Sequence, residues 1–125
     1  MVKVLVVDDD PDLRVLISKL VGMLGAEAIQ ARDGVDAESV VMRSNPDMIL
    51  MDIMMPNQDG VVTCARLRAQ GFSGPIILLS AMSEFTGRTR ATECGATAYL
   101  QKPMSRATLK PYLDNIRTSL STESI

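Results

Sequence analysis

The stretch VLVVDDDP, residues 4–11, places four aliphatic residues directly before three aspartates and a proline. A short aliphatic run of this kind is typical of a strand buried on both faces of a parallel sheet. Asp10 followed by Pro11 is a helix start, with an N-cap aspartate and proline at the first helical position. The stretch therefore predicts a buried strand that passes through an acidic turn into a helix.

The same alternation of aliphatic runs and helical patterns continues along the whole chain. We predict strands at residues 2–7, 27–31, 47–52, 75–80 and 97–101. We predict helices at residues 11–24, 35–44, 58–70, 84–94 and 105–119. Strands alternating with helices of this length indicate βαβ crossovers. The fold class is α/β: a (βα)5, doubly wound, five-stranded parallel sheet with helices on both faces.

Two of the predicted helices carry signals that bear on later points. The first has one apolar stripe at spacings of three and four: Leu13, Leu16, Ile17, Leu20 and Leu24. The fourth helix, at 84–94, has the weakest pattern, because Gly87 interrupts it and large apolar residues are few. That segment is either not a helix or a mobile element.

Length and composition predict one soluble domain. The chain has 125 residues, of which 46% are hydrophobic and 3% aromatic, so the core is aliphatic. We expect the domain to span residues 1–119, followed by a frayed tail at 120–125. No apolar run reaches the roughly 18 residues of a membrane span. The N-terminus enters a strand without a targeting segment. A cytoplasmic protein with no membrane partner is expected.

Charges and cysteines add two expectations. The net charge of −2 argues against general nucleic-acid binding. Residues 1–83 carry 7 basic and 11 acidic side chains, a net charge of −4, and residues 84–125 carry 6 and 4, a net charge of +2. The net charges of the two segments therefore differ in sign. Cys64 and Cys94 fall in predicted helices, where we interpret them as small buried apolar residues in a reducing compartment.

Polar side chains end four of the five predicted strands. Asp8 and Asp9 follow the first strand, Asp52 ends the third, Ser80 ends the fourth, and Lys102 follows the fifth. In an open α/β sheet, functional groups gather at the carboxyl ends of the strands. The sequence therefore predicts that these five residues share one site.

The chemistry of that site follows from its charges. Two carboxylates about 5 Å apart repel by about 3 kcal/mol at an effective dielectric near 20, which is about two pKa units. A divalent cation removes this cost, and Mg²⁺ prefers carboxylate and carbonyl oxygens and often bridges to phosphate. Taken singly, the aspartates could be helix caps or turn residues, and Lys102 a surface charge. Their joint placement after separate strands favours a site for Mg²⁺ and a phosphoryl group.

The chain resembles the receiver domain of two-component response regulators, and is similar to single-domain chemotaxis and phosphorelay regulators. The resemblance covers residues 2–119. It rests on VLVVDDDP (4–11), DMILMDIMMP (47–56) with Asp59-Gly60, PIILLSA (75–81) and GATAYLQKP (95–103). It implies a flavodoxin-like sheet order, in agreement with the fold class predicted from the pattern.

The resemblance also implies a role for each strand-end residue. Asp52 would be the phosphoacceptor that forms an acyl phosphate. Asp9, Asp52 and the main-chain carbonyl of Met54 would ligate Mg²⁺, with Asp8 supporting the metal through water. Lys102 would pair with Asp52 at rest and with a phosphoryl oxygen afterwards.

Three further positions complete the pattern. Ser80 would donate its hydroxyl to a phosphoryl oxygen, and Tyr99 would turn inward when Ser80 moves. Packing on an edge strand is the alternative role for Tyr99. The Lys102–Pro103 bond resembles the family's cis peptide, which X–Pro chemistry permits.

The implied function is a phosphorylation-dependent protein switch rather than a conventional enzyme. The domain would take its phosphoryl group from a sensor histidine kinase, a histidine phosphotransfer protein or a small phosphodonor, with Mg²⁺-dependent self-phosphorylation and self-dephosphorylation. The chain has no histidine, so it is not itself the phosphohistidine donor. We expect a monomer or a weak phosphorylation-dependent dimer that binds no nucleic acid directly.

The output face would be formed by helices 84–94 and 105–119 with strand 97–101. Its basic residues suit an acidic partner, or are simply solvated: Arg88, Arg90, Arg106, Lys110 and Arg117. Met54 and Met82 lie two positions beyond site residues, where they would screen hydrolytic water. Slow self-dephosphorylation is our hypothesis.

Three other classes of function are less consistent with the residues. A flavodoxin-like cofactor binder needs a Ser/Thr/Gly-rich loop after the first strand, where this chain has Asp8, Asp9 and Asp10. Aspartate-dependent phosphatases resemble Asp-x-Asp-Gly-Thr, which is missing. An interaction module that is never phosphorylated usually lacks one of the key groups, and all are present here.

Overall fold

The computed structural model describes residues 1–123, and the side chains of residues 1–119. The strands are β1 (Lys3–Val7), β2 (Glu27–Ala31), β3 (Met48–Asp52), β4 (Ile76–Ser80) and β5 (Ala98–Gln101). The helices are α1 (Pro11–Met23), α2 (Gly34–Ser44), α3 (Gly60–Ala69), α4 (Glu84–Cys94) and α5 (Arg106–Glu123). All neighbouring strands are parallel, in the order β2-β1-β3-β4-β5. The predicted fold class is confirmed.

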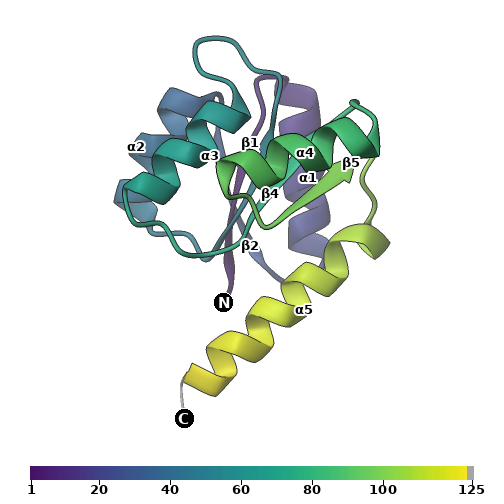
Figure 1. The fold of residues 1–125 in the computed structure, drawn as a ribbon. Helices are drawn as coiled ribbons and strands as arrows, with labels where there is room; N and C mark the ends of the chain where they lie inside the picture. The colour runs from purple at the N-terminus through teal and green to yellow at the C-terminus, as the bar shows by residue number, and fades with distance from the viewer. Residues whose placement is uncertain (124–125) are drawn as a thin grey trace.

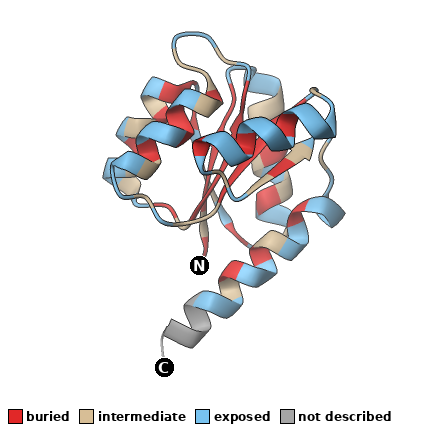
Figure 2. Cartoon of the chain, in the orientation of Figure 1, coloured by how far each residue is buried: buried red, intermediate tan, exposed pale blue. Residues whose placement is uncertain are grey.

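The two faces of the sheet pack against different helices (Figure 1). Alternate strand residues point to opposite faces, as strand geometry requires. On one face Leu5 and Ile49 join side chains of α2, α3 and α4. On the other face Val4 and Leu50 join side chains of α1 and α5. Figure 2 shows the strands as a buried centre between exposed outer helix faces. Because both faces are covered, β3 and β4 are apolar up to their last residues, Asp52 and Ser80.

The helix ends follow the local chemistry of the sequence. Asp10 caps α1 by accepting hydrogen bonds from the backbone N–H groups of Asp12 and Leu13, at 2.9 and 3.4 Å. Asp33, Asp59 and Ser83 cap α2, α3 and α4 in the same way. These caps satisfy backbone donors that a helix start leaves unpaired, and they fix where each loop at the carboxyl edge ends.

Helix α4 forms over the predicted residues, so the alternative that this segment is not a helix is wrong. Its interruption, Gly87, is buried, and a Cβ built there would lie 2.2 Å from the ring of Tyr99. The glycine is therefore required by packing, although it lowers helix propensity.

Two helices differ from the sequence prediction. In α1 the inward residues are Ile17 and Val21, while Leu16 of the predicted stripe is 53% exposed. The predicted apolar stripe therefore wrongly included Leu16 and omitted Val21, which faces the core. Helix α5 continues to Glu123, four residues past the predicted end, so residues 120–123 of the expected tail have a helical backbone. Residues 124–125 of that tail lie outside the described residues. Within 1–123, no helix has the length and hydropathy needed to cross a bilayer.

Candidate functional site

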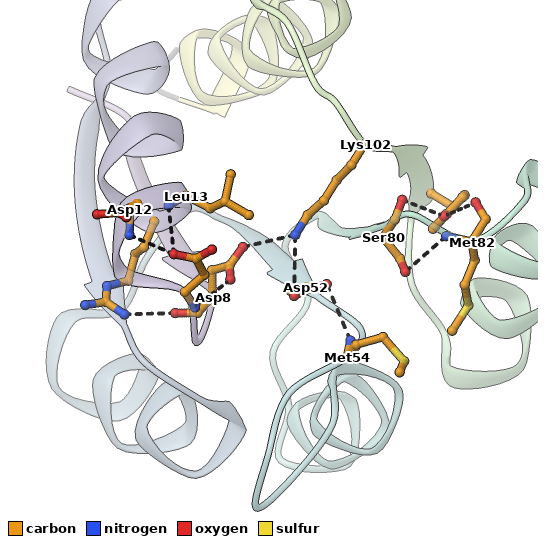
Figure 3. A network of polar contacts seen from close by, with 11 residues as sticks. Asp8, Asp12, Leu13, Asp52, Met54, Ser80, Met82 and Lys102 are labelled. Atoms are coloured by element: carbon orange, nitrogen blue, oxygen red, sulfur yellow. Dashed lines mark hydrogen bonds and ion pairs between the residues drawn. The ribbon is translucent and has the colours of Figure 1, made fainter.

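The carboxyl edge of the sheet brings the predicted residues together (Figure 3). Asp8 and Asp9 follow β1, and Asp52 is the last residue of β3. Ser80 ends β4, and Lys102 lies one residue beyond β5. In Figure 3, Asp52 lies between Asp8 on one side and Ser80 on the other, with Lys102 extending toward the two carboxylates.

Three carboxylates form a tight acidic cluster. One oxygen each of Asp8, Asp9 and Asp52 lies within 4.8 Å of the others. Asp8 and Asp52 are 1% and 6% exposed, whereas Asp9 is at the surface. Oxygen ligands from three carboxylates, two of them removed from water, suit a hard divalent cation such as Mg²⁺. The residues present therefore fit the ion that the sequence pattern indicated.

The Lys102 ammonium bridges the two buried carboxylates. Its Nζ lies 3.2 Å from Oδ2 of Asp8 and 3.4 Å from Oδ2 of Asp52. The pairing of Lys102 with Asp52 was expected, but the contact with Asp8 was not. The backbone of Lys102 is held in place because its N–H donates to the Ser80 carbonyl at 2.8 Å. The Lys102–Pro103 peptide bond is cis, as the resemblance implied.

Burial dominates the electrostatics of Asp52. Loss of solvent raises the pKa of its carboxyl group, Lys102 lowers it, and the negative charge of Asp8 raises it again. The backbone N–H of Met54 donates to Oδ1 at 3.4 Å and lowers it slightly. The net direction is upward, so the single ammonium does not fully compensate two buried carboxylates. A further positive charge bound beside these carboxylates would be electrostatically favourable.

Ser80 and Tyr99 form the other side of the site. The Ser80 hydroxyl accepts a hydrogen bond from the Met82 N–H at 3.3 Å. Tyr99 is 6% exposed, and its hydroxyl donates to the carbonyls of Ser80 and Met82 at 2.9 and 2.7 Å. Burial raises the pKa of the phenol. Tyr99 therefore already points inward, with its ring over Gly87 and its hydroxyl on the β4–α4 connection.

The loop after β3 is fastened to α2 by contacts that the sequence analysis missed. Asn57, at a left-handed φ of 67°, donates to Oδ2 of Asp33 at 3.0 Å. Gln58 donates to Glu38 at 2.8 Å. The loop is also closed on itself, because the N–H of Gly60 donates to the Ile53 carbonyl at 2.8 Å. The backbone that carries the Met54 carbonyl is thus fixed from two directions.

Gly60 also belongs to the site, although the sequence pattern alone did not single it out. A Cβ at Gly60 would lie 2.2 Å from the carbonyl oxygen of Asp52, so α3 begins in direct contact with the end of β3. Adding any side chain there would push the loop away from the acidic cluster.

The family model for the response regulator receiver domain matches residues 4–114. The chain belongs to the response regulator receiver family. Receiver domains of two-component systems accept phosphoryl groups and bind Mg²⁺ through an acidic pocket. Among the described residues, Asp8, Asp9 and Asp52 form an acidic cluster at the carboxyl edge of the sheet.

Relatives of known sequence support the assignment. The receiver is 36% identical over 104 residues to the response regulator MprA of Mycobacterium sp. strain KMS, covering 83% of this chain and 45% of MprA. It is 34% identical over 114 residues to the probable transcriptional regulator ycf27 of Porphyridium aerugineum, covering 91% and 47%. The chain thus spans about half the length of these curated relatives.

Solved structures show the same fold over nearly the whole chain. The N-terminal domain of an uncharacterized protein from Wolinella succinogenes has a TM-score of 0.89 at 31% identity, covering 98% of this chain and 99% of that one. The Vibrio cholerae chemotaxis protein CheY4 has a TM-score of 0.82 at 30% identity, covering 93% and 98%. The chain is thus similar both to a chemotaxis protein of about its own length and to regulators about twice as long.

Proposed function

We propose that this receiver takes a phosphoryl group onto Asp52 from a phosphohistidine of a sensor histidine kinase or histidine phosphotransfer protein, or from a small phosphodonor. The observation that carries the proposal is the cluster of three carboxylate oxygens within 4.8 Å, bridged by Lys102. Two buried carboxylates placed close together are electrostatically unfavourable by themselves. They are useful where a cation and a phosphoryl group complete the charge balance.

Each residue then has a chemical role. A carboxylate oxygen of Asp52 attacks phosphorus, a P–O bond forms, and the bond to the donor breaks with its electron pair leaving on the donor. Asp8, Asp9, Asp52 and the Met54 carbonyl would hold Mg²⁺, which when bound neutralises charge on the phosphoryl oxygens. Lys102, already between the two buried carboxylates, can follow the negative charge onto the phosphoryl group.

Switching would begin at Ser80. Its hydroxyl, now hydrogen-bonded to the Met82 N–H, would turn toward a phosphoryl oxygen and draw the β4–α4 connection with it. Tyr99 holds the carbonyls of both residues, so the movement is felt at β5 and α4. A phosphoryl group shifts this equilibrium only as far as it interacts more favourably with one state than with the other. A change in populations from 1:99 to 99:1 needs a difference in interaction free energy of about 5.5 kcal/mol.

The output would be a protein contact on the face of α4, β5 and α5. The basic residues there are partly paired: Arg88 lies 2.6 Å from Glu84, and Lys110 lies 2.7 Å from Asp114. This pairing weakens the case for an acidic partner. The matched transcriptional regulators are twice as long, so in such a protein the face would act on another domain, and nucleic acid would be contacted there rather than by this receiver.

The acyl phosphate would be long-lived. Met54 is 64% exposed and Met82 half-buried, each two positions beyond a site residue. Thioether chains offer an attacking water no base and occlude its line of approach. Replacing both, Met54→Asn with Met82→Glu, should shorten the lifetime by about tenfold, about 1.4 kcal/mol in the barrier. An unchanged lifetime, measured by loss of the phosphorylated mass, would contradict this.

The decisive experiment is intact mass after incubation with acetyl phosphate. One added phosphoryl group that requires both Mg²⁺ and Asp52, and disappears in Asp52→Asn, is the expected result. Failure to gain mass, together with no binding of beryllofluoride, would favour an interaction module that works without phosphorylation.

A further inference from the structure

The two cysteines of the chain are 30 residues apart in sequence but meet in the core. Cys64 lies in α3 and is fully buried, and Cys94 is the last residue of α4 and is 6% exposed. The Cys64 Sγ donates to the Cys94 carbonyl oxygen at 3.3 Å. The Cys94 Sγ in turn donates to the Ala91 carbonyl oxygen at 3.5 Å. The contact between Cys64 and Cys94 joins the two helices at a point that the phosphoryl site does not use.

The two thiols are chemically different. The neighbouring Cys64 thiol lowers the pKa of Cys94 to about 7 against the effect of burial, and a backbone N–H at Ala96 and the charge of Arg68 lower it further. The proximity of Cys94, together with burial, raises the pKa of Cys64. The thiolate is the reactive form of cysteine. Cys94, which is 6% exposed and ends α4, is better placed to act as the nucleophile than Cys64, which is fully buried.

Cys94 lies at a point of the core that is close to solvent. It is followed by Gly95, which is exposed and ends α4 in a left-handed conformation at φ 82°. Thr92 and Glu93, in the last turn before it, are exposed as well. Helix ends open locally at much lower free energy than the whole fold. Local opening of this turn would expose Cys94 to a small oxidant.

We propose that Cys64 and Cys94 are a redox-active pair, which a hydroperoxide converts to an intramolecular disulfide between α3 and α4. The Cys94 thiolate attacks one peroxide oxygen, the O–O bond breaks, and hydroxide leaves, so that Cys94 becomes a sulfenic acid. The Cys64 sulfur then attacks the Cys94 sulfur, and the sulfenic oxygen leaves as water. Two thiols are oxidised and one hydrogen peroxide is reduced to two waters. A dithiol reverses the reaction by exchange.

The cross-link would act on the moving part of the receiver. The chain between the two cysteines contains all of β4 and, at the start of α4, the Gly87 contact with Tyr99. A bond from α3 to the end of α4 restrains the displacement of α4 relative to the rest of that face. Oxidation would then limit the conformational response without touching Asp52.

The test uses the reduced chain and hydrogen peroxide under native conditions, followed by unfolding, alkylation and intact mass. Both cysteines should lose their alkylation together, with a mass lower by two hydrogens, and dithiothreitol should restore both. The sulfoxide of Met42, which is 83% exposed, serves as an internal measure of oxidant exposure. Conversion of Met42 while both thiols remain alkylatable would overturn the proposal, as would sulfinic acids without a disulfide.

Matched variants separate the two steps. Cys64→Ala should stop at a Cys94 sulfenic acid that dimedone traps, and Cys94→Ala should leave Cys64 unreactive. The reverse pattern would overturn the assignment of the nucleophile. If either variant fails to fold, the disulfide-linked peptide of the wild-type chain decides the matter alone. Asp52→Asn should oxidise at the wild-type rate, so the outcome is independent of phosphoryl transfer.

Discussion

Replacing Gly87 by alanine should destabilise the receiver, although the same change normally stabilises a helix. Glycine inside a helix costs about 1 kcal/mol relative to alanine. Here the new Cβ would lie 2.2 Å from both Cε2 and Cζ of the Tyr99 ring. Overlaps of this size in a packed interior cost about 1–3 kcal/mol or force the ring out. We expect the free energy of unfolding to fall by about 1–3 kcal/mol in Gly87→Ala.

A double-mutant cycle isolates the contact. With Tyr99→Ala the space above residue 87 is open, so Gly87→Ala should then raise the free energy of unfolding by about 1 kcal/mol. The coupling between the two sites is the difference, about 2–4 kcal/mol. Urea unfolding followed by far-UV circular dichroism measures all four proteins, provided that the m-value is the same in each.

Gly22 supplies the matched control. It lies in α1, and no atom lies within 4 Å of a Cβ built there. Gly22→Ala should therefore stabilise the protein by up to about 1 kcal/mol, less if the helix end frays. Should Gly87→Ala behave like Gly22→Ala, or should the coupling with Tyr99 be under about 1 kcal/mol, the reasoning about this packing contact is refuted.

Three further predictions concern the acidic cluster and the loop beside it. At a hundredfold excess over its dissociation constant, Mg²⁺ should raise the free energy of unfolding by about 2.7 kcal/mol, and by less than half of that in Asp8→Asn; equal gains would contradict the assigned ligands. The pKa of Asp33 is lowered, chiefly by the N–H of Asp36, so its stabilisation is present above the ordinary pKa near 4 and is lost as pH falls through the lower folded value. Acid titration of stability should therefore be flatter in Asp33→Asn than in the wild type. Asn57→Gly, which keeps the left-handed turn but loses the bond to Asp33, should raise the half-saturating Mg²⁺ concentration for phosphorylation about two- to tenfold. The exchanged pair Asp33→Asn with Asn57→Asp should restore it, and no change in Asn57→Gly would show that the loop is fixed by other contacts.

The strands and helix starts could be predicted because each depends on a few adjacent residues. Aliphatic runs before Asp8, Asp52 and Ser80 mark strands buried on both faces, and Asp10-Pro11 marks a helix start. The five polar strand-end residues were then placed at one edge by topology alone. That is why the acidic cluster and Lys102 were predictable without knowledge of any distance.

The contacts that sequence analysis missed join segments that are distant along the chain. Gly87 was recognised as a helix interruption, but its reason lies 12 positions away in the ring of Tyr99. The Asn57–Asp33 bond and the meeting of the two thiols depend on how α2, α3 and α4 pack on one face of the sheet. No periodicity in the sequence encodes such a pairing, because each partner is locally consistent with an ordinary turn or core position.

The place of the acidic cluster in the sheet bears on how the domain can respond to phosphorylation. The acidic cluster is unfavourable by itself, since burial and Asp8 together raise the pKa of Asp52 against the effect of Lys102. It is tolerated because β1 and β3, which carry it, are inner strands of the sheet and are buried on both faces. The proposed switch residues Ser80 and Tyr99 lie on β4 and β5, and β5 is an edge strand with a neighbouring strand on one side only. In the proposed switch, we therefore expect a phosphoryl group on Asp52 to displace β5 and α4 more readily than the inner strands that carry the acidic cluster.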